Sequence, residues 1–280
     1  MSRRNKTVKG LAGTLRQKLG QLLALSANPH AEPGKPYLLE NDGMLSLQFD
    51  ALCLQSEMNI DDPDQLVFSY TRAMMSFLLF EPSPRRIAMI GLGGGSLAKY
   101  CYRYLPQAEI AVVEINPDVI ALRNEFAIPV DDDRFKVLLG DGAVFVKENG
   151  DLFDVLMVDG FDTTGLPGAL CSQQFYDDCF AALADNGIMV ANLWSNNGLH
   201  GALVSRIETS FAGSVVMVNA DDSPNQIVLA FKNAELSMSP ARIKQHVNAL
   251  AQSHPLNFQA KSKKLIAALA AGAMHQAALE

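Results

Sequence analysis

Two carboxylates three residues apart follow a strongly apolar stretch of the chain. Asp159 and Asp162 come directly after Phe153–Val158, in a segment rich in glycine and proline. Such a pair can bind an ammonium group, and one carboxylate can accept a proton, because each anion raises the proton affinity of the other. In a purely structural interpretation Asp162 starts a turn and Asp159 caps backbone amides. Loops after parallel strands often carry function, so the pair is our first candidate for catalysis.

A glycine-rich segment follows another apolar stretch. Arg86–Ile90 leads into the sequence Gly-Leu-Gly-Gly-Gly-Ser, after which a helix pattern begins. Glycines allow a sharp turn and let a ligand approach the backbone, next to a helix N-terminus that favours polar or anionic groups. A tight turn without a ligand would explain the segment if it stood alone. The candidate ligand-binding glycines are Gly91, Gly93, Gly94 and Gly95.

Acidic residues end the next two apolar segments. Glu114 comes 19 residues after Gly95, where a carboxylate can accept hydrogen bonds from both hydroxyls of a ribose. Asp141, which precedes Gly142, can accept a hydrogen bond from an adenine amino group or cap a helix. Ligands of open α/β sheets bind at the carboxyl ends of strands. The three features together predict an adenosine-containing cofactor.

The choice of adenosine compound depends on two positions. A nicotinamide site would favour a third glycine where Ser96 stands, and it does not need an acid at Asp141. A site for an S-adenosyl sulfonium uses the glycine segment and both acids. We therefore prefer an S-adenosyl sulfonium compound over a nicotinamide cofactor.

The elements that must position these residues form an α/β pattern. From residue 86 onward, apolar strand-like segments alternate with helix-like segments, and the strands are apolar on both faces. This predicts a doubly wound, mostly parallel sheet, the Rossmann-like fold of the class I S-adenosylmethionine-dependent methyltransferases. Within it, a helix is expected to start near Pro117 and to run to Phe126.

The chain divides into four parts by composition. A β hairpin is expected around Asn41–Gly43, and a buried helix is expected to start at Asp61 and to end before Pro82. The predicted parts are a basic, possible helical arm (1–35), a small N-terminal β-hairpin domain (36–60), the Rossmann-like catalytic domain (61–235) and C-terminal helices (236–280).

Composition excludes several classes of protein. The 280 residues are 49% hydrophobic, and no apolar stretch reaches the length of a bilayer span, so we expect no membrane partner and a cytoplasmic location. The net charge of −7 disfavours nucleic acid and suits a cationic small molecule. The four cysteines lack metal-ligand spacing, so we expect neither zinc nor disulfides.

The chain resembles the spermidine synthase (polyamine aminopropyltransferase) family from about Leu45 to Phe231. The most specific match is DGFDTTGLPGALCSQQFY, from Asp159 to Tyr176, and GLGGGS, VEINPDVI and GDGAVFV match in order and spacing. The resemblance implies transfer of an aminopropyl group from decarboxylated S-adenosylmethionine to a diamine such as putrescine. It also implies a homodimer and no metal.

The resemblance also implies roles for individual residues. Asp159 would be the base and ammonium anchor, and Asp162 would help to position the diamine. Tyr70 and Gln55 would line the pocket. Glu114 would bind the ribose and Asp141 the adenine of the nucleoside.

Two departures from the family pattern keep alternatives open. Gly94 stands where the family has the aspartate that binds the aminopropyl ammonium, and Arg72 follows Tyr70 where a cationic substrate would not favour a cation. The first alternative is a methyltransferase that uses intact S-adenosylmethionine on a small acceptor. The second is a catalytically weak protein that binds an adenosyl ligand.

Overall fold

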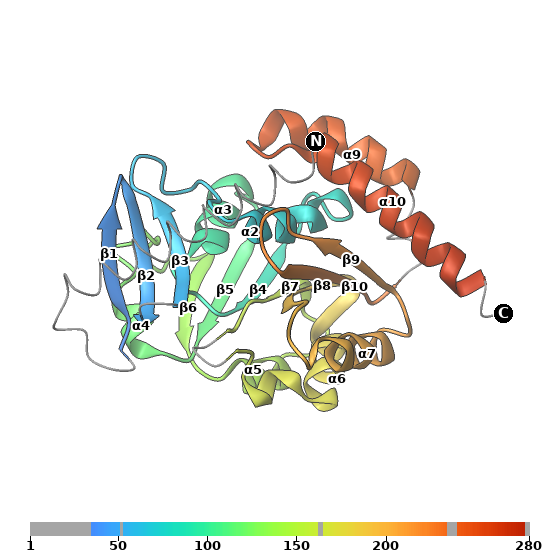
Figure 1. The fold of residues 1–280 in the computed structure, drawn as a ribbon, viewed down its shortest axis with the longest axis horizontal. Helices are drawn as coiled ribbons and strands as arrows, with labels where there is room; N and C mark the ends of the chain where they lie inside the picture. The colour runs from blue at the N-terminus through green and yellow to red at the C-terminus, as the bar shows by residue number, and fades with distance from the viewer. Residues whose placement is uncertain (1–34, 51–52, 162–164, 234–239, 278–280) are drawn as a thin grey trace, which may run out of the picture.

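The fold consists of two β-sheets and the helices that cover the larger one (Figure 1). The computed structural model describes residues 35–50, 53–161, 165–233 and 240–277. A small antiparallel sheet comprises three strands, β1 (Tyr37–Asn41), β2 (Met44–Asp50) and β3 (Cys53–Asn59). The large sheet comprises β4 (Arg86–Ile90), β5 (Glu109–Glu114), β6 (Phe135–Leu139), β7 (Phe153–Val158), β8 (Leu183–Trp194), β9 (Val215–Asn219) and β10 (Asn225–Phe231).

The large sheet has the strand order β6-β5-β4-β7-β8-β10-β9. The five strands from β6 to β8 pair in parallel, and β10 pairs antiparallel with both β8 and β9. The prediction of a doubly wound, mostly parallel sheet is therefore confirmed. The strand order reverses between β4 and β7, and open sheets bind their ligands at such a point.

Each central strand is buried on both faces because its side chains alternate between two cores. In β4, Ile87 and Met89 belong to one core, and Ala88 and Ile90 belong to the other. All four side chains are almost fully buried. This explains why the strand reads as a continuous apolar run rather than as an alternation of polar and apolar residues.

Helices cover both faces of the large sheet (Figure 1). The helices are α2 (Ser69–Met74), the 3-10 helix η1 (Met75–Leu79), α3 (Ser96–Tyr104), α4 (Pro117–Ala121), α5 (Gly142–Glu148), the 3-10 helix η2 (Gly168–Cys171), α6 (Gln173–Ala182), α7 (His200–Ser210), α9 (Pro240–Ser253) and α10 (Phe258–Ala277). The first core contains residues of η1, α3, α9 and α10, and the second contains residues of α5, α6 and α7.

The small sheet begins with the predicted hairpin. Asp42 and Gly43 have φ angles of 50° and 74°, the left-handed conformation that a tight two-residue turn requires. Tyr37 to Asn41 pair with Met44 to Gln48 across this turn. β3 then pairs with β2 and contacts α3, which brings the small sheet next to the glycine segment.

The helix expected to start at Asp61 begins instead at Ser69. Asn59 is the physical reason, because its side-chain oxygen accepts a hydrogen bond from the backbone N–H of Asp61 and forms a local turn. A second turn follows, in which the N–H of Gln65 donates to the carbonyl of Asp62. The predicted helix start was wrong, because the Asn59 side chain stabilises a turn at the place where the sequence pattern predicted the N-terminus of the helix.

The helix expected to run from Pro117 to Phe126 stops at Ala121. The chain after it must turn back, because Phe126 and Ile128 pack against the glycine segment. Ala127 between them has a φ angle of 51°, which a continuous helix does not allow. The amphipathic pattern predicted the helix start correctly, but packing against the glycines set its end.

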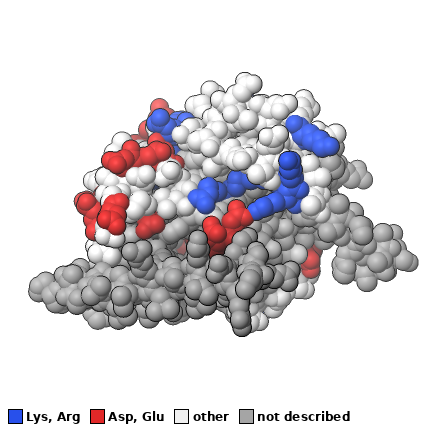
Figure 2. Space-filling view, turned by 45° about the horizontal axis from the view of Figure 1, so that its top comes forward, with Lys and Arg blue, Asp and Glu red and all other residues white. Residues whose placement is uncertain are grey.

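Charged side chains of both signs lie on the face shown in Figure 2, in separate small groups rather than in one field of a single sign. Within the described ranges, no helix combines the length and the apolar character that crossing a membrane requires. The charge distribution that matters most for binding is that of the cavity described next.

Candidate active site

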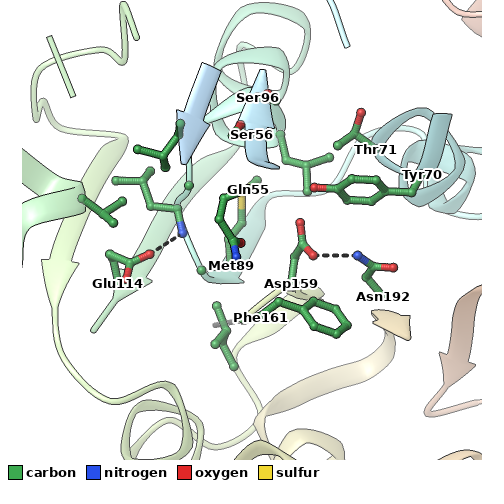
Figure 3. Close-up of a pocket in the computed structure, with 18 of the residues that line it drawn as sticks. Gln55, Ser56, Tyr70, Thr71, Met89, Ser96, Glu114, Asp159, Phe161 and Asn192 are labelled. Carbon is green, nitrogen blue, oxygen red and sulfur yellow. Dashed lines mark hydrogen bonds between the residues drawn. The ribbon is translucent and has the colours of Figure 1, made fainter. Parts of the chain in front are cut away.

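A cavity of about 1010 Å³ lies at the carboxyl ends of β4, β5, β6 and β7. Its wall also includes residues of β3, α2 and β8 and of the turn between β9 and β10. Figure 3 shows side chains from these separate elements pointing toward one another around the cavity. The cavity therefore occupies the place where the strand order reverses and where open α/β sheets bind ligands.

Gly91 and Gly93 line the cavity where the chain leaves β4. Gly91 has a φ angle of 93°, and a Cβ atom there would lie 2.3 Å from the carbonyl oxygen of Asp159. Its N–H donates to the carbonyl of Val113 over 2.9 Å. The backbone of the glycine segment thus passes between the tips of β5 and β7 with no room for a side chain, as a segment that cradles a ligand does.

Gly94 and Gly95 are not among the residues that line the cavity. A Cβ atom at Gly94 would lie 2.6 Å from Oγ of Ser56 and 2.8 Å from the ring of Phe126. A Cβ atom at Gly95 would lie 2.5 Å from Ile128. These two glycines allow the segment to pack closely against β3 and against the chain that follows α4.

Glu114 holds the glycine segment in place from the end of β5. Its side chain is 8% exposed. Oε2 accepts a hydrogen bond from the N–H of Leu92 over 2.9 Å, and Oε1 accepts one from the N–H of Asn116 over 2.8 Å. A carboxylate has about four acceptor positions, so these two bonds orient Glu114 and leave it able to accept from ligand hydroxyls.

Asp141 lines the cavity and also caps α5. Oδ1 accepts a hydrogen bond from the N–H of Ala143 over 2.7 Å. The next residue, Gly142, must be small, because a Cβ atom there would lie 2.4 Å from Ile90. The structural and the ligand-binding interpretations of Asp141 are therefore compatible, since capping fixes the carboxylate at the cavity wall.

Asp159 is bound by two side chains from different elements. Oδ1 accepts a hydrogen bond from Nδ2 of Asn192 over 2.8 Å, and the hydroxyl of Tyr70 also donates to the carboxylate. Figure 3 shows Tyr70 and Asn192 on two sides of the carboxylate. Burial raises the pKa of Asp159 above its usual value, and the two hydrogen bonds oppose this effect.

Tyr70 is suited to act as a neutral hydrogen-bond donor. Burial, and then the charge of Asp159, raise the pKa of Tyr70 well above its usual value. The phenol therefore keeps its proton at physiological pH. Its ring stacks on Phe68, with centroids 5.8 Å apart, and this contact helps to hold the hydroxyl toward Asp159.

The other predicted site residues have different outcomes. Gln55 lines the cavity from β3, where the register of the β2–β3 ladder shifts. Asp162 lies outside the described residues, so its position relative to Asp159 stays a prediction. The structure thus brings together residues predicted from separate segments, namely Gln55, Tyr70, Gly91, Gly93, Glu114, Asp141, Gly142 and Asp159.

Sequence analysis missed several residues of the cavity wall. Asn225, Asp222 and Ser223 reach the cavity from the turn before β10 and from its first residue. Phe161 and Trp194 also line it and stack on each other, with ring centroids 4.9 Å apart and an interplanar angle of 17°. The turn sequence between two short strands could have indicated Asp222, Ser223 and Asn225 as site residues.

The wall of the cavity carries more acidic than basic side chains. Arg72 is the basic residue of this wall within the described part of the chain, and its Nη1 donates to the backbone carbonyls of Leu66 and Val67. The guanidinium is thus directed partly at the backbone. The acidic residues of the wall are Glu57, Glu114, Asp141, Asp159 and Asp222.

Residues 67–220 match the spermine/spermidine synthase domain. The chain is 37% identical to a polyamine aminopropyltransferase of Neisseria meningitidis over 221 residues, which cover 78% of this chain and 84% of that protein. It is 39% identical to a polyamine aminopropyltransferase of Chromobacterium violaceum over 212 residues, covering 75% and 79% of the two chains.

A solved structure of spermidine synthase in complex with the transition-state analogue AdoDATO has a similar fold. Its TM-score is 0.63 at 19% identity, and the match covers 82% of this chain and 85% of that one. The fold and the site define an α/β protein with a cavity at the carboxyl ends of its parallel strands. The sequence matches go further, and the chain belongs to the spermine/spermidine synthase family.

Proposed function

We propose that this protein is a polyamine aminopropyltransferase that moves an aminopropyl group from decarboxylated S-adenosylmethionine to a diamine such as putrescine. The observation that carries the proposal is the position of Asp159. Its carboxylate lies at the wall of a nucleoside-sized cavity, bound by Tyr70 and Asn192. Family membership supports the same reaction class.

The charge of the cavity wall supports the decarboxylated co-substrate. Among the residues that the structure describes, five carboxylates and one guanidinium line the cavity. Such a wall attracts cations and repels anions, and the low dielectric of a cleft strengthens both effects. Decarboxylated S-adenosylmethionine carries a sulfonium and an ammonium group without a carboxylate. The intact compound adds a carboxylate that this wall disfavours.

The nucleoside fits residues near the tips of β4, β5 and β6. Glu114 would accept hydrogen bonds from the ribose hydroxyls, and Asp141 would accept one from the adenine amino group. Gly91 and Gly93 would supply the close backbone approach that the ligand needs, because a Cβ atom at Gly91 would clash with the carbonyl of Asp159 and Gly93 has a φ angle of 51°. Gln55 would contact the nucleoside from β3.

The transfer itself needs a neutral amine in line with the carbon and the sulfur. The nitrogen lone pair forms a bond to the methylene carbon next to the sulfonium, and the carbon–sulfur bond breaks with its electron pair passing to sulfur. The nitrogen loses one proton, which Asp159 accepts. Spermidine and methylthioadenosine leave. Asp159 and Tyr70 thereby position the amine and remove its proton.

Asp222 is our candidate for the second ammonium of the acceptor. It lines the cavity from the turn between β9 and β10, away from the nucleoside residues Glu114 and Asp141 in the strand order. A diamine has two amino groups, of which the reacting one would lie at Asp159 and lose its proton there. The carboxylate of Asp222 would stabilise the other group, which stays protonated, and would select diamines over monoamines.

Methyl transfer from intact S-adenosylmethionine is the second candidate. The observation in its favour is Gly94, which stands where the family has an aspartate and whose surroundings leave no space for one. Without that aspartate, the carboxylate of the intact compound meets less repulsion. The acidic wall of the cavity argues against methyl transfer, because it disfavours the carboxylate of the intact compound.

Parallel incubations of the purified protein distinguish the two. Decarboxylated S-adenosylmethionine with putrescine is expected to give spermidine and methylthioadenosine, detected by mass spectrometry. S-adenosylmethionine with putrescine is expected to give no S-adenosylhomocysteine. The reverse result would replace aminopropyl transfer by methyl transfer, and binding of both compounds without any product would leave a ligand-binding protein.

A further inference from the structure

Three neighbouring strands of the large sheet each contribute a polar side chain to one hydrogen-bonded row, in which both asparagines are buried and Asp159 is half-buried. Asp159 follows β7, Asn192 lies in β8, and Asn225 is the first residue of β10. The side chains of Asn192 and Asn225 are only 2% and 8% exposed. They lie among apolar residues of the sheet, where polar groups persist only if they are hydrogen-bonded.

In both hydrogen bonds of this row, the donor is the residue farther from Asp159. Nδ2 of Asn225 donates to Oδ1 of Asn192 over 2.9 Å, and Nδ2 of Asn192 donates to Oδ1 of Asp159 over 2.8 Å. Figure 3 shows the second of these bonds. Each amide uses its nitrogen toward the carboxylate, so the row delivers a donor to Asp159.

Asn225 decides which end of the Asn192 amide faces Asp159. If the Asn192 amide turned over, its oxygen would face a carboxylate oxygen and its nitrogen would face the donor nitrogen of Asn225. Two acceptor oxygens would then face each other at Asp159, and two donor nitrogens would face each other at Asn225. Both hydrogen bonds would be lost, which is costly away from water. The donor of Asn225 therefore excludes the turned-over amide.

We propose that Asn192 and Asn225 are positioning residues that hold Asp159 as an oriented carboxylate, ready to accept the proton of the acceptor amine. This inference rests on the proposed function. Neither asparagine takes part in bond formation. Asn192 stabilises the negative charge, and Asn225 acts through Asn192.

Other charged groups act on Asp159 from the elements around it. Tyr70 of α2 is the titratable side chain in hydrogen-bond contact with it within the described ranges. Arg72 is on the same helix and donates to backbone carbonyls. The remaining charged residues of the wall are Glu57 of β3, Glu114 after β5, Asp141 before α5 and Asp222 before β10. The substitutions at Asn192 and Asn225 keep all of these charged side chains.

The test is the pH dependence of kcat/KM for putrescine in Asn192→Leu and Asn225→Leu. Without the donated hydrogen bond, the carboxylate is stabilised less and takes up a proton at higher pH. We expect Asn192→Leu to lose about tenfold or more in kcat/KM at pH 6 and to recover to within about threefold at pH 9. Asn225→Leu should show a smaller loss in the same direction.

Gln226→Leu is the matched control. Gln226 follows Asn225 in β10 and is not among the residues that line the cavity; its amide nitrogen donates to Asn219, and its amide oxygen contacts Nε2 of His200. The control removes a side-chain amide from the same strand, so it should lower stability without changing the shape of the pH profile. Loss of equal size at every pH in Asn192→Leu would overturn the inference.

Two further measurements keep the test decisive. If the leucine variants do not fold, Asn225→Ser keeps a hydroxyl in place of the amide and is expected to show the same partial loss at pH 6.

If the wild-type protein releases no methylthioadenosine, the proposed function fails. The positioning role is then tested by the fluorescence of Trp194, which is the single tryptophan and lines the same cavity. Its pH titration should move to higher pH in Asn192→Leu, and an unchanged titration would refute the role.

Discussion

Gly94 packs closely against Ser56 and Phe126, and its replacement gives a sharp test of this packing. A Cβ atom there would lie 2.6 Å from Oγ of Ser56 and 2.8 and 2.9 Å from two ring atoms of Phe126. Ordinary van der Waals contacts are longer than about 3.4 Å. Gly94→Ala therefore forces the glycine segment and its neighbours apart.

The expected loss follows from overpacking in a buried place. Such changes typically destabilise by about 1–3 kcal/mol. In a domain of this size each kcal/mol lowers the melting temperature by about 2–4 °C. We expect Gly94→Ala to fall within this range and Gly94→Asp to lose more, because it also buries a carboxylate. Ser56→Ala removes the shortest contact and should restore part of the stability of Gly94→Ala.

Calorimetry of the melting transition measures these differences, with titration of decarboxylated S-adenosylmethionine as the second readout. Gly201→Ala is the control, since Gly201 lies in α7 with no atom within 4 Å of a new Cβ. The control should melt at the wild-type temperature or slightly above it. Wild-type stability of Gly94→Ala, or tighter co-substrate binding by Gly94→Asp, would refute the reasoning.

The other predictions concern three charged side chains. Asp159→Asn should lower the rate of transfer by about 10² to 10⁴ and leave the affinity for methylthioadenosine nearly unchanged. Since burial raises the pKa of Asp159, its charge opposes folding at neutral pH. The same variant should therefore unfold at higher urea at pH 7 than the wild type, with a smaller difference at lower pH. Asp222→Asn should raise KM for putrescine several-fold and leave KM for a monoamine acceptor unchanged, and equal effects on both would exclude a contact with the second ammonium. Burial lowers the pKa of Lys99 to about 8, so the unfolded chain binds more protons between pH 8 and 10 and stability from this group rises with pH. Lys99→Met should flatten that rise in a pH series of urea unfolding, and an unchanged slope would contradict it.

Features encoded locally were the ones that the sequence made predictable. The apolar strands, the hairpin at Asp42 and Gly43, and Glu114 at the end of β5 depend on residues close together in the chain. Conformation there follows from turn chemistry and from burial on both faces of a strand. The same is true of Asp159, whose place at the tip of β7 follows from the strand before it.

Features that depend on distant packing were not predictable in this way. Asn192 and Asn225 are 33 residues apart and meet because β10 runs antiparallel to β8. The short α4 depends on the packing of Phe126 against Gly94. The direction of Arg72 depends on backbone carbonyls five and six residues earlier. Each of these is a tertiary contact that overrides a local pattern.

A crystal structure with methylthioadenosine bound tests the central claim most directly. The account predicts the ribose hydroxyls on Glu114, the adenine near Asp141, and the sulfur facing the carboxylate of Asp159 between Tyr70 and Asn192. A nucleoside bound outside this cavity, or a sulfur atom turned away from Asp159, would contradict it.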